Sequence, residues 1–258
     1  MSDEQHVRSD RTGMVGLVVL DRPAKLNALD RAMLDQMVQI LREFDADESI
    51  RAIVLAGGEK AFAAGADVGD LAEANPIELY TSGFSEKWDE VAAISTPTVA
   101  AVSGYALGGG LELALICDII VADPSASFGL PEASIGTMPG SGGTQRLVRA
   151  VGKSLAMEMI LAGRRLSAEE AFRQGLVSTL AEPGAAQAVA TSIAERIAAS
   201  APLAVRLARS AVLESFDATL TTGIRYERAL SAILAASLDQ AEGLRAFTNK
   251  KKPRFVGR

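Results

Sequence analysis

Glycine is concentrated in one stretch of the chain, and this concentration constrains the fold more than any other feature. Nine of the 23 glycines lie in the forty residues 104–143. Glycine at this density inside a folded domain indicates turns with positive φ or a close approach of the backbone to another group. The segment also contains Glu112 and Glu132 in apolar surroundings. It is therefore either a set of tight turns or the backbone wall of a ligand site, and we favour the second interpretation.

The charge and the rare side chains disfavour several function classes. The net charge is −6, whereas a general nucleic-acid binder needs a basic field. The only histidine is His6, in a polar N-terminal stretch that we expect to be loose, so a Ser-His or Cys-His catalytic pair is disfavoured. The only cysteine, Cys117, allows no intramolecular disulfide and no multi-cysteine zinc site. Acid–base chemistry must then fall mainly on Glu, Asp, Lys or Tyr.

The sequence shows no targeting or membrane segment. Residues 1–10 contain no apolar run typical of a signal peptide, and they are too acidic for a typical transit peptide. The longest apolar stretch, 111–122, is interrupted by Glu112 and Asp118 and is too short to span a bilayer. Together with the single cysteine, these features predict a cytoplasmic protein without a membrane partner.

Apolar runs and helical periodicities alternate along the chain and predict an α/β fold. The predicted strands are short and apolar: residues 15–20, 52–56, 98–102 and 119–122. A helix capped by Asp30 is predicted after the first of them. Beyond residue 152 we predict helices at 154–161, 167–174, 185–200, 203–216, 220–237 and 240–249. The last three carry more apolar residues than one helix face needs, so we expect a core over residues 1–195 and a helical oligomerisation region over 196–258.

Four glycine-containing patterns carry candidate chemistry. They occupy residues 61–67, 104–112, 128–136 and 140–145. Each pattern alone is typical of a turn or a helix start, in which Glu112 only complements a helix dipole and Glu132 is a surface glutamate. Together they bring two carboxylates and several unpaired backbone N–H donors into positions where these groups can converge on one cavity. A water molecule between the glutamates would lose a proton to one while the other supplies a proton.

At these residues the sequence closely resembles the crotonase (enoyl-CoA hydratase/isomerase) family, and within it the hydratases. The resemblance runs from Val15 to Phe255, nearly the whole chain. It is carried by blocks at residues 22–29, 61–67, 104–112, 129–132 and 136–146. Any one block alone would be weak, whereas their joint spacing is very specific.

The resemblance implies a chemical role for four positions. The backbone N–H groups of Ala66 and Gly109 form an oxyanion hole in families of this kind. Glu112 mainly activates water, and Glu132 mainly delivers the α-proton. The implied reaction adds water to a trans-2-enoyl-CoA and gives a 3-hydroxyacyl-CoA, in fatty acid β-oxidation or related acyl-CoA catabolism. No metal or redox cofactor is implied, because coenzyme A is part of the substrate.

The resemblance also implies the fold, the assembly and the substrate contacts. The implied fold is a crotonase-like spiral of ββα units with a helical C-terminal region, assembled as a trimer or as a dimer of trimers. The implied substrate-binding positions are Lys25, Ala28, Ala64, Ala66, Asp67, Val68, Gly109, Gly140 and Lys250. Many relatives carry a lysine where this chain has Gly69. Lys25 and Lys250 remain as candidates for the adenine and 3′-phosphate region of CoA, with solvated surface charge as a nearly equal alternative.

Other functions remain open at this point. An enoyl-CoA isomerase needs one proton-shuttling base and no bound water, so the presence of both glutamates favours hydration. Another crotonase-family acyl-CoA lyase is also compatible with these residues. A non-enzymatic acyl-CoA-binding protein is disfavoured by the intact carboxylates. RNA binding is disfavoured by the net charge of −6, and a serine peptidase on a related spiral by the single histidine.

Overall fold

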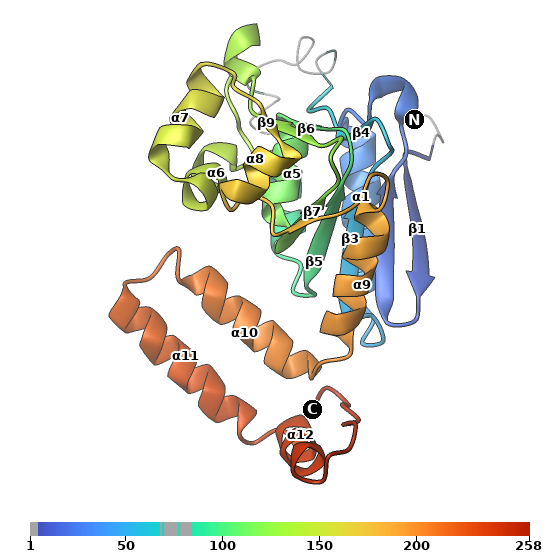
Figure 1. The fold of residues 1–258 in the computed structure, drawn as a ribbon, viewed down its shortest axis with the longest axis vertical. Coiled ribbons are helices and arrows are strands. Elements are labelled where there is room, and N and C mark those ends of the chain that lie inside the picture. Colours follow the sequence, from blue (N-terminus) through green and yellow to red (C-terminus); the bar gives the residue numbers. More distant parts are fainter. Residues whose placement is uncertain (1–4, 68, 70–76, 78–83) are drawn as a thin grey trace.

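The computed structural model describes residues 5–67, 69, 77 and 84–258. Its strands form two sheets, which Figure 1 shows side by side. The larger sheet has the order β1 (Val7–Thr12), β2 (Val15–Leu20), β3 (Ala52–Ala56), β5 (Thr98–Val102), β7 (Ile119–Ala122) and β10 (Thr179–Leu180). The smaller has the order β4 (Ala61–Ala63), β6 (Tyr105–Leu107), β8 (Ser127–Gly129) and β9 (Leu166–Ser167). Neighbouring strands are parallel except in the pairs β1–β2 and β8–β9.

The helices follow the strands in a repeating order. The helices that accompany the sheets are α1 (Arg31–Ala46), α4 (Phe84–Ala92), α5 (Gly109–Ile116), α6 (Gly143–Val151), α7 (Lys153–Leu161), α8 (Ala168–Arg173) and α9 (Ala186–Ala198), with 3-10 helices η1 (Pro23–Lys25) and η2 (Glu132–Ile135). Three successive units, β3–β4–α4, β5–β6–α5 and β7–β8–α6, each place one strand in the larger sheet, the next in the smaller sheet and then a helix. This is the predicted spiral of ββα units.

Apolar sequence explains why the centre of the larger sheet is covered on both faces. β3 and β5 are uninterrupted apolar strands with every residue buried, as expected for parallel strands inside an α/β fold. Because successive side chains point to opposite faces, Val54 and Val99 pack with the alanines of α9, while Ile53 and Leu55 pack on the side of α1. The predicted cap is also present, since Asp30 accepts a hydrogen bond from Met33 N at 2.8 Å.

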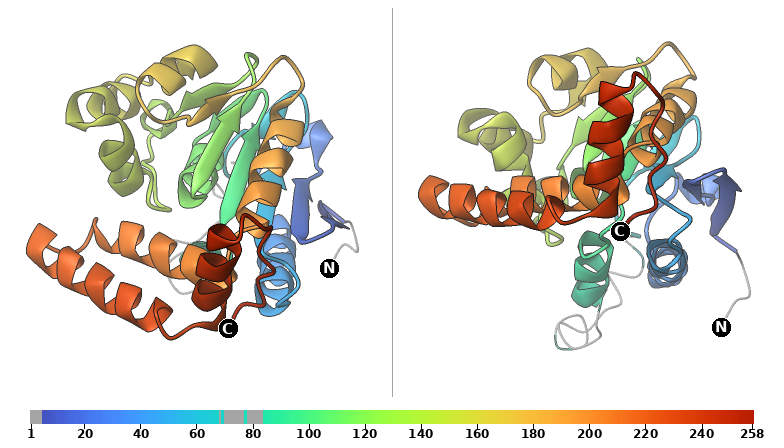
Figure 2. Two further views of the ribbon diagram at one scale, coloured as in Figure 1. Left: turned by 60° about the horizontal axis from the view of Figure 1, so that its bottom comes forward. Right: turned by 90° about the horizontal axis from the view of Figure 1, so that it is seen from below.

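Three C-terminal helices form an arm that extends away from the sheets (Figures 1 and 2). They are α10 (Pro202–Glu214), α11 (Leu220–Leu234) and α12 (Leu238–Thr248). An ion pair of 2.7 Å between Arg209 and Asp118 ties α10 to the core. No residue of α10 is buried, and large apolar side chains of the arm are exposed, among them Val212, Leu213, Phe216, Leu220, Ile233, Leu238, Leu244 and Phe247.

The expectation of a loose N-terminal stretch is wrong for the part that the structure describes. His6 is 7% exposed, and the strand β1 begins immediately after it. The backbone N–H groups of His6 and Val7 donate to the side-chain amide of Gln36, at 2.8 and 3.1 Å. Only Val7 in this edge strand is buried, and polar residues fill the other positions, so the sequence lacks the apolar alternation that announces a strand.

The predicted boundary between the two regions of the chain lies near the end of α9. The boundary at residue 196 falls in the last turn of α9, and the chain leaves the core between Ala198 and Pro202; the division into two regions stays a prediction.

Within the described residues, no single helix is long and apolar enough to cross a membrane. The consecutive helices α9 and α10 reach that length only together, with a bend of 111° between them.

Candidate active site

Two glycine turns meet at one edge of the smaller sheet. β4 and β6 are parallel neighbours, so the turns that follow them, residues 64–67 and Gly108, leave the sheet on the same side. The first turn is held against Leu29, whose N–H donates to Gly65 O at 2.7 Å and whose carbonyl accepts from Asp67 N at 3.1 Å. A β-carbon on Gly65 would lie 3.3 Å from Leu107 O, which shows how closely the two turns approach.

Two unpaired backbone donors lie side by side where these turns meet. Gly109 is the first residue of α5, and the first N–H groups of a helix have no partner inside it. Neither Gly109 N nor Ala66 N donates a hydrogen bond within the part of the chain that the structure describes. A β-carbon on Gly109 would stand 3.4 Å from Ala66 N. The pair therefore forms a ready site for an oxygen that carries negative charge.

Glu112 points from the first turn of α5 toward the turn that precedes α6. Its side chain is buried, and Oε1 accepts hydrogen bonds from Ser141 N and Gly143 N, each 2.8 Å long. Burial raises the pKa of Glu112 above its usual range, while the two N–H bonds and the positive charge of Arg146 act in the opposite direction. The carboxylate is thus held by one oxygen, and its interactions with backbone donors favour the ionised form.

Glu132 lies in η2, on the other side of the Gly108 turn. Its Oε1 is 3.2 Å from the position of a β-carbon on Gly108, and its Oε2 is buried without a hydrogen-bond partner among the described residues. Burial raises the pKa of Glu132 to about 7 against the effect of a backbone hydrogen bond within the residue, and the negative charge of Glu112 makes a smaller contribution to the rise. Near neutral pH this glutamate is therefore partly protonated and can give up a proton.

Burial raises the pKa of both glutamates, but their hydrogen bonding differs. Two backbone N–H groups, Ser141 N and Gly143 N, donate to Glu112 and oppose the rise of its pKa, whereas one backbone hydrogen bond, from its own residue, acts in that direction on Glu132. This difference in hydrogen bonding favours Glu112 as the base and Glu132 as the acid. With the two N–H donors beside them, the glutamates form a site for adding or removing a proton next to a polarised carbonyl.

The family comparison agrees with this arrangement. The sequence model of the enoyl-CoA hydratase/isomerase family matches residues 10–258. The chain belongs to the enoyl-CoA hydratase/isomerase family. It is 47% identical over 246 residues to a probable enoyl-CoA hydratase of Rhizobium meliloti, an alignment that covers 95% of this chain and 96% of the relative. It is 45% identical to the mitochondrial enoyl-CoA hydratase of Pongo abelii, over 95% of this chain and 84% of the relative.

Solved structures show the same fold. A crystal structure of an enoyl-CoA hydratase subunit from Geobacillus kaustophilus superposes with a TM-score of 0.96 at 44% sequence identity, covering 100% of both chains. These likenesses confirm the predicted α/β spiral with a helical C-terminal region. They also confirm the family that the spacing of the glycine blocks indicated.

Sequence reasoning missed three residues of this family member's site. Trp88 in α4 is 3% exposed, its Cη2 lies 3.5 Å from the β-carbon position of Gly109, and its Nε1 has no hydrogen-bond partner among the described residues. Ser141 N donates to the carboxylate of Glu112, and the positive charge of Arg146 acts on the same carboxylate. The block at 136–146 contains the last two, whereas the only available signal for Trp88 was that it is the single tryptophan.

Several predicted substrate-binding residues lie around the two turns. Ala64 is half-buried and donates its N–H to Leu26 O at 3.0 Å. Asp67 accepts a hydrogen bond of 2.8 Å from Arg22, which holds the pKa of Asp67 below its usual range against the smaller effect of burial. Lys25 is exposed in η1, and its charge reaches Asp67. Ala28 is half-buried beside the same turn, with its carbonyl accepting from Arg22.

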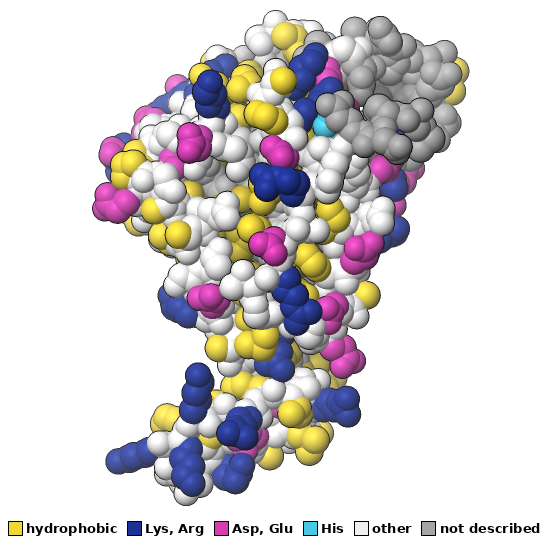
Figure 3. Space-filling model, turned by 90° about the vertical axis from the view of Figure 1, so that its right-hand side faces the viewer, with side chains coloured by type: hydrophobic (Ala, Val, Ile, Leu, Met, Phe, Trp, Pro, Cys, Tyr) yellow, Lys and Arg dark blue, Asp and Glu magenta, His cyan; other side chains and the backbone are white. Residues whose placement is uncertain are grey.

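The remaining predicted substrate-binding positions do not lie in the two glycine turns. Gly140 is exposed next to the turn that holds Glu112. Val68 lies outside the described residues. Lys250 is exposed and follows α12, which lies at the opposite end of the molecule from β4 and β6 (Figure 1), so a single chain does not bring it to the turns. Basic side chains gather at that end of the arm in Figure 3.

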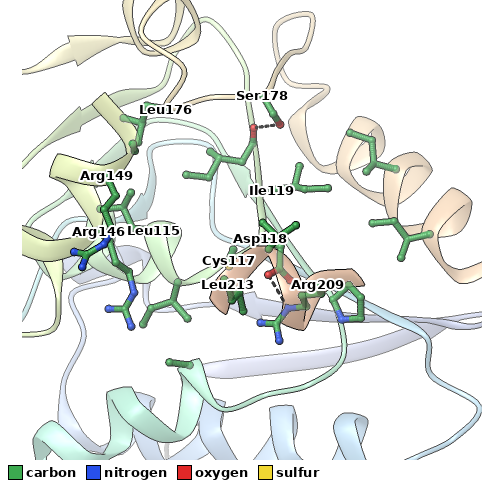
Figure 4. A pocket seen from close by; sticks show the side chains of 18 of the residues that line it. Leu115, Cys117, Asp118, Ile119, Arg146, Arg149, Leu176, Ser178, Arg209 and Leu213 are labelled. Carbon is green, nitrogen blue, oxygen red and sulfur yellow. Dashed lines mark hydrogen bonds and ion pairs between the residues drawn. The ribbon is translucent and has the colours of Figure 1, made fainter. Parts of the chain in front are cut away.

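A large cleft lies on the other side of Arg146. Its volume is 960 Å³, and it opens between the C-terminal end of α5, α6, α9 and α10 (Figure 4). Apolar residues such as Leu115, Ile119 and Leu213 line it, together with several arginines. Neither glutamate and neither oxyanion donor belongs to its lining, so this cleft is separate from the candidate active site.

The described residues contain no cluster of three His, Cys, Asp or Glu side chains that could hold a metal ion.

Proposed function

We propose that this protein is an enoyl-CoA hydratase, which adds water to a trans-2-enoyl-CoA and forms a 3-hydroxyacyl-CoA in fatty acid β-oxidation or related acyl-CoA catabolism. One observation carries the proposal: Glu112, which accepts two backbone hydrogen bonds, and Glu132, whose pKa is raised to about 7, lie beside two backbone N–H groups that have no acceptor among the described residues. The relatives at 42–47% identity that bear the name enoyl-CoA hydratase support the same reaction.

The proposed step balances without any other reactant. Glu112 removes a proton from water, and the resulting hydroxide oxygen forms a bond to C3 of the substrate. The π electrons of the C2=C3 bond move toward the thioester carbonyl and give an enolate. Glu132 then delivers a proton to C2, and the carbonyl is restored. One water has been added, and a proton passes from Glu112 to Glu132 through solvent before the next turnover.

The backbone donors Ala66 N and Gly109 N stabilise the enolate oxygen in this scheme. Negative charge on the oxygen is greatest when the new C–O bond is formed and the α-proton has not yet arrived. Loss of one such preorganised donor typically costs about 3 kcal/mol of transition-state stabilisation. Positioned acid and base groups contribute about 100-fold to 10,000-fold each.

No cofactor enters the proposed reaction, because water and the acyl-CoA thioester supply all the atoms and no electrons leave the substrate. We assign the protein no nucleic-acid or membrane partner; its net charge of −6 supports the first of these statements. The cytoplasmic location stays a prediction, supported by the single cysteine, which leaves no intramolecular disulfide for an oxidising compartment to maintain.

We propose that the chain assembles as a trimer or as a dimer of trimers. The arm formed by α10, α11 and α12 buries few of its own side chains, and Leu220 and Phe247 are 82% and 85% exposed. Apolar surface beyond what the subunit itself covers is usually covered by a partner, and closed symmetric rings are the common solution. Light scattering at micromolar concentration tests this assembly: a mass of three or six subunits is expected, and a monomer mass would contradict it.

Isotope incorporation tests the proposed reaction. The protein is incubated with a short 2-enoyl-CoA in H₂¹⁸O, and the product is analysed by mass spectrometry. Hydration predicts a 3-hydroxyacyl-CoA with ¹⁸O on C3. A parallel incubation with the 3-enoyl-CoA isomer tests isomerisation. An isomerase would convert the 3-enoyl substrate to the 2-enoyl isomer and would incorporate no ¹⁸O from water into the product of either substrate. This result would refute the hydratase proposal.

A further inference from the structure

Arg146 lies behind the turn that holds the carboxylate of Glu112. It belongs to the first half of α6, and its side chain runs back along the helix to residues 141 and 142. We propose that Arg146 is a positioning residue, which fixes the orientation and the charge of the Glu112 carboxylate through Ser141 while itself touching no substrate atom. This proposal rests on the proposed function, and it names a residue that acts on the base Glu112 without contacting the substrate.

The contacts form a short chain from Arg146 to Glu112. Nη1 of Arg146 donates to Ser141 O at 2.9 Å, and the backbone N–H of Arg146 donates to Gly142 O at 2.8 Å. Ser141 N and Gly143 N donate in turn to Oε1 of Glu112. Arg146 thus binds two successive carbonyls of the turn whose N–H groups hold the carboxylate. A displacement of this turn would move both donors at once.

Gly142 shows that the turn and the arginine fit each other closely. Its φ is +100°, a conformation that favours glycine. A β-carbon at this position would also overlap Nη1 of Arg146. The guanidinium therefore lies directly across the turn, and a side chain at position 142 would displace it.

Charge gives Arg146 a second effect on the same carboxylate. Among the described residues, the charged groups that face Glu112 are Arg146 from α6 and Glu132 from η2, and Asp89 from α4 faces Arg146 in turn. Burial raises the pKa of Glu112, and the hydrogen bonds and the positive charge of Arg146 oppose that rise. Without the guanidinium, Glu112 would hold its proton to higher pH and would be a base for a smaller part of the time.

Arg149 offers a matched control on the same helix. It lies three residues further along α6, where side chains at i and i+3 are neighbours. Figure 4 shows both arginines at the same wall of the cleft. Arg149, however, is exposed, and its Nη1 donates to Gln145 O within its own helix. Replacement of Arg149 removes the same charge from the same cleft but no contact with the Ser141 turn.

Steady-state kinetics of Arg146→Gln and Arg149→Gln give the first test. We expect Arg146→Gln to lower kcat by about 100-fold with KM nearly unchanged, since small displacements of a reacting group have effects of this size. Arg149→Gln should retain wild-type kcat. Arg146→Lys should recover part of the kcat, because lysine keeps the charge but not the planar guanidinium. Equal kcat in the two Gln variants, or a loss confined to KM, would overturn the proposal.

Titration of the Glu112 carboxyl gives a second test that needs no activity. The protein is labelled with ¹³C-carboxyl glutamate, and the Glu112 resonance is assigned by its loss in Glu112→Gln. The titration midpoint of Glu112 should rise in Arg146→Gln and stay at the wild-type value in Arg149→Gln and Arg146→Lys. An unchanged midpoint in Arg146→Gln would overturn the charge effect.

The two tests separate the possible failures. A wild-type protein that hydrates no enoyl-CoA would refute the proposed function, while the titration would still decide whether Arg146 controls Glu112. Should Arg146→Gln fail to fold, Arg146→Lys decides the matter: a lowered kcat at an unchanged melting temperature supports the proposal. A wild-type kcat in Arg146→Lys would overturn the positioning role, since a positive charge without the planar guanidinium would then be sufficient.

Discussion

Oε1 of Glu132 lies 3.2 Å from the point where a β-carbon on Gly108 would stand. Gly108 has φ +52° and ψ −127°, and its N–H donates to Gly129 O at 2.9 Å. The residue therefore connects β6 to α5 in a conformation that favours glycine, and it leaves room for a carboxyl group at the same time. The acid and the oxyanion donors depend on this one turn for their relative positions.

Substitution of Gly108 by alanine should displace the Glu132 carboxyl. The new methyl group would push the Glu132 carboxyl away from the turn, and the positive φ would add strain of about 1–3 kcal/mol. We expect kcat to fall by at least about 10-fold, because the acid is displaced from its position. Gly152→Ala is the control, since Gly152 also has a positive φ but no atom within 4 Å of its β-carbon position. Comparable kcat in both folded variants would argue against the proposed position of the acid.

The raised pKa of Glu132 also predicts how stability depends on pH. Its pKa in the folded protein is about 7, above the ordinary value of 4.5, so the folded state binds this proton more tightly than the unfolded state. The stabilisation is fully present below pH 4.5 and is lost as the pH rises through 7. After allowance for solvent screening of this half-buried group, the loss amounts to about 1–2 kcal/mol.

Thermal unfolding of Glu132→Gln checks this sign. Glutamine is neutral at every pH, so the variant should not share the loss. Compared with the wild type, it should gain in free energy of unfolding between pH 4 and pH 8. A constant difference between the two proteins across this range would show that Glu132 is not held in its neutral form.

The pH dependence of kcat/KM should be bell-shaped. Glu112 must be ionised to accept a proton, and its pKa is raised, so the rate should fall on the acid side. Glu132 must be protonated, and its pKa of about 7 predicts a fall on the alkaline side above that pH. The two apparent pKa values belong to the coupled pair. Measurements of kcat/KM below and above pH 7, in buffers of constant ionic strength, test this dependence. A flat profile through pH 7 would exclude Glu132 as the acid.

The sequence predicted the long elements well because their periodicity is strong. The apolar runs of β2, β3, β5 and β7 and the helices after residue 152 lie where they were expected, with ends that differ by a few residues. The strands β4, β6 and β8 have only three residues each, which is too short for a period of two to be recognised. The second sheet was therefore implied only by the family resemblance.

The candidate site was predictable in its chemistry but not in its contacts. Glycine density and the two glutamates indicated acid–base work beside bare backbone. Nothing local in the sequence indicates that Ser141 N, 29 residues from Glu112, donates to its carboxylate. The unpartnered state of Glu132 Oε2 likewise depends on packing between distant segments. Such contacts follow from the turns of the spiral and become visible only in three dimensions.

Gly109→Val should abolish the oxyanion site while leaving the fold intact. Ala66 N and Trp88 lie 3.4 and 3.5 Å from the β-carbon position of Gly109, so the two γ-methyl groups of valine would fill the space between the donors. We expect kcat/KM to fall by at least about 100-fold, the usual effect of losing one donor. Gly58→Val is the control, because its β-carbon position has no contact shorter than 3.9 Å. Full activity in a folded Gly109→Val protein would place the carbonyl elsewhere.

The most direct test of the two-glutamate site is the loss of ultraviolet absorbance of conjugated 2-enoyl-CoA thioesters of graded chain length, followed with the wild type, Glu112→Gln and Glu132→Gln. Hydration removes the conjugated chromophore. The wild type should consume at least one chain length, and each variant should turn over at least about 100-fold more slowly with acyl-CoA affinity little changed. Wild-type turnover in Glu132→Gln, or a chromophore left intact by the wild type at every chain length, would contradict the account.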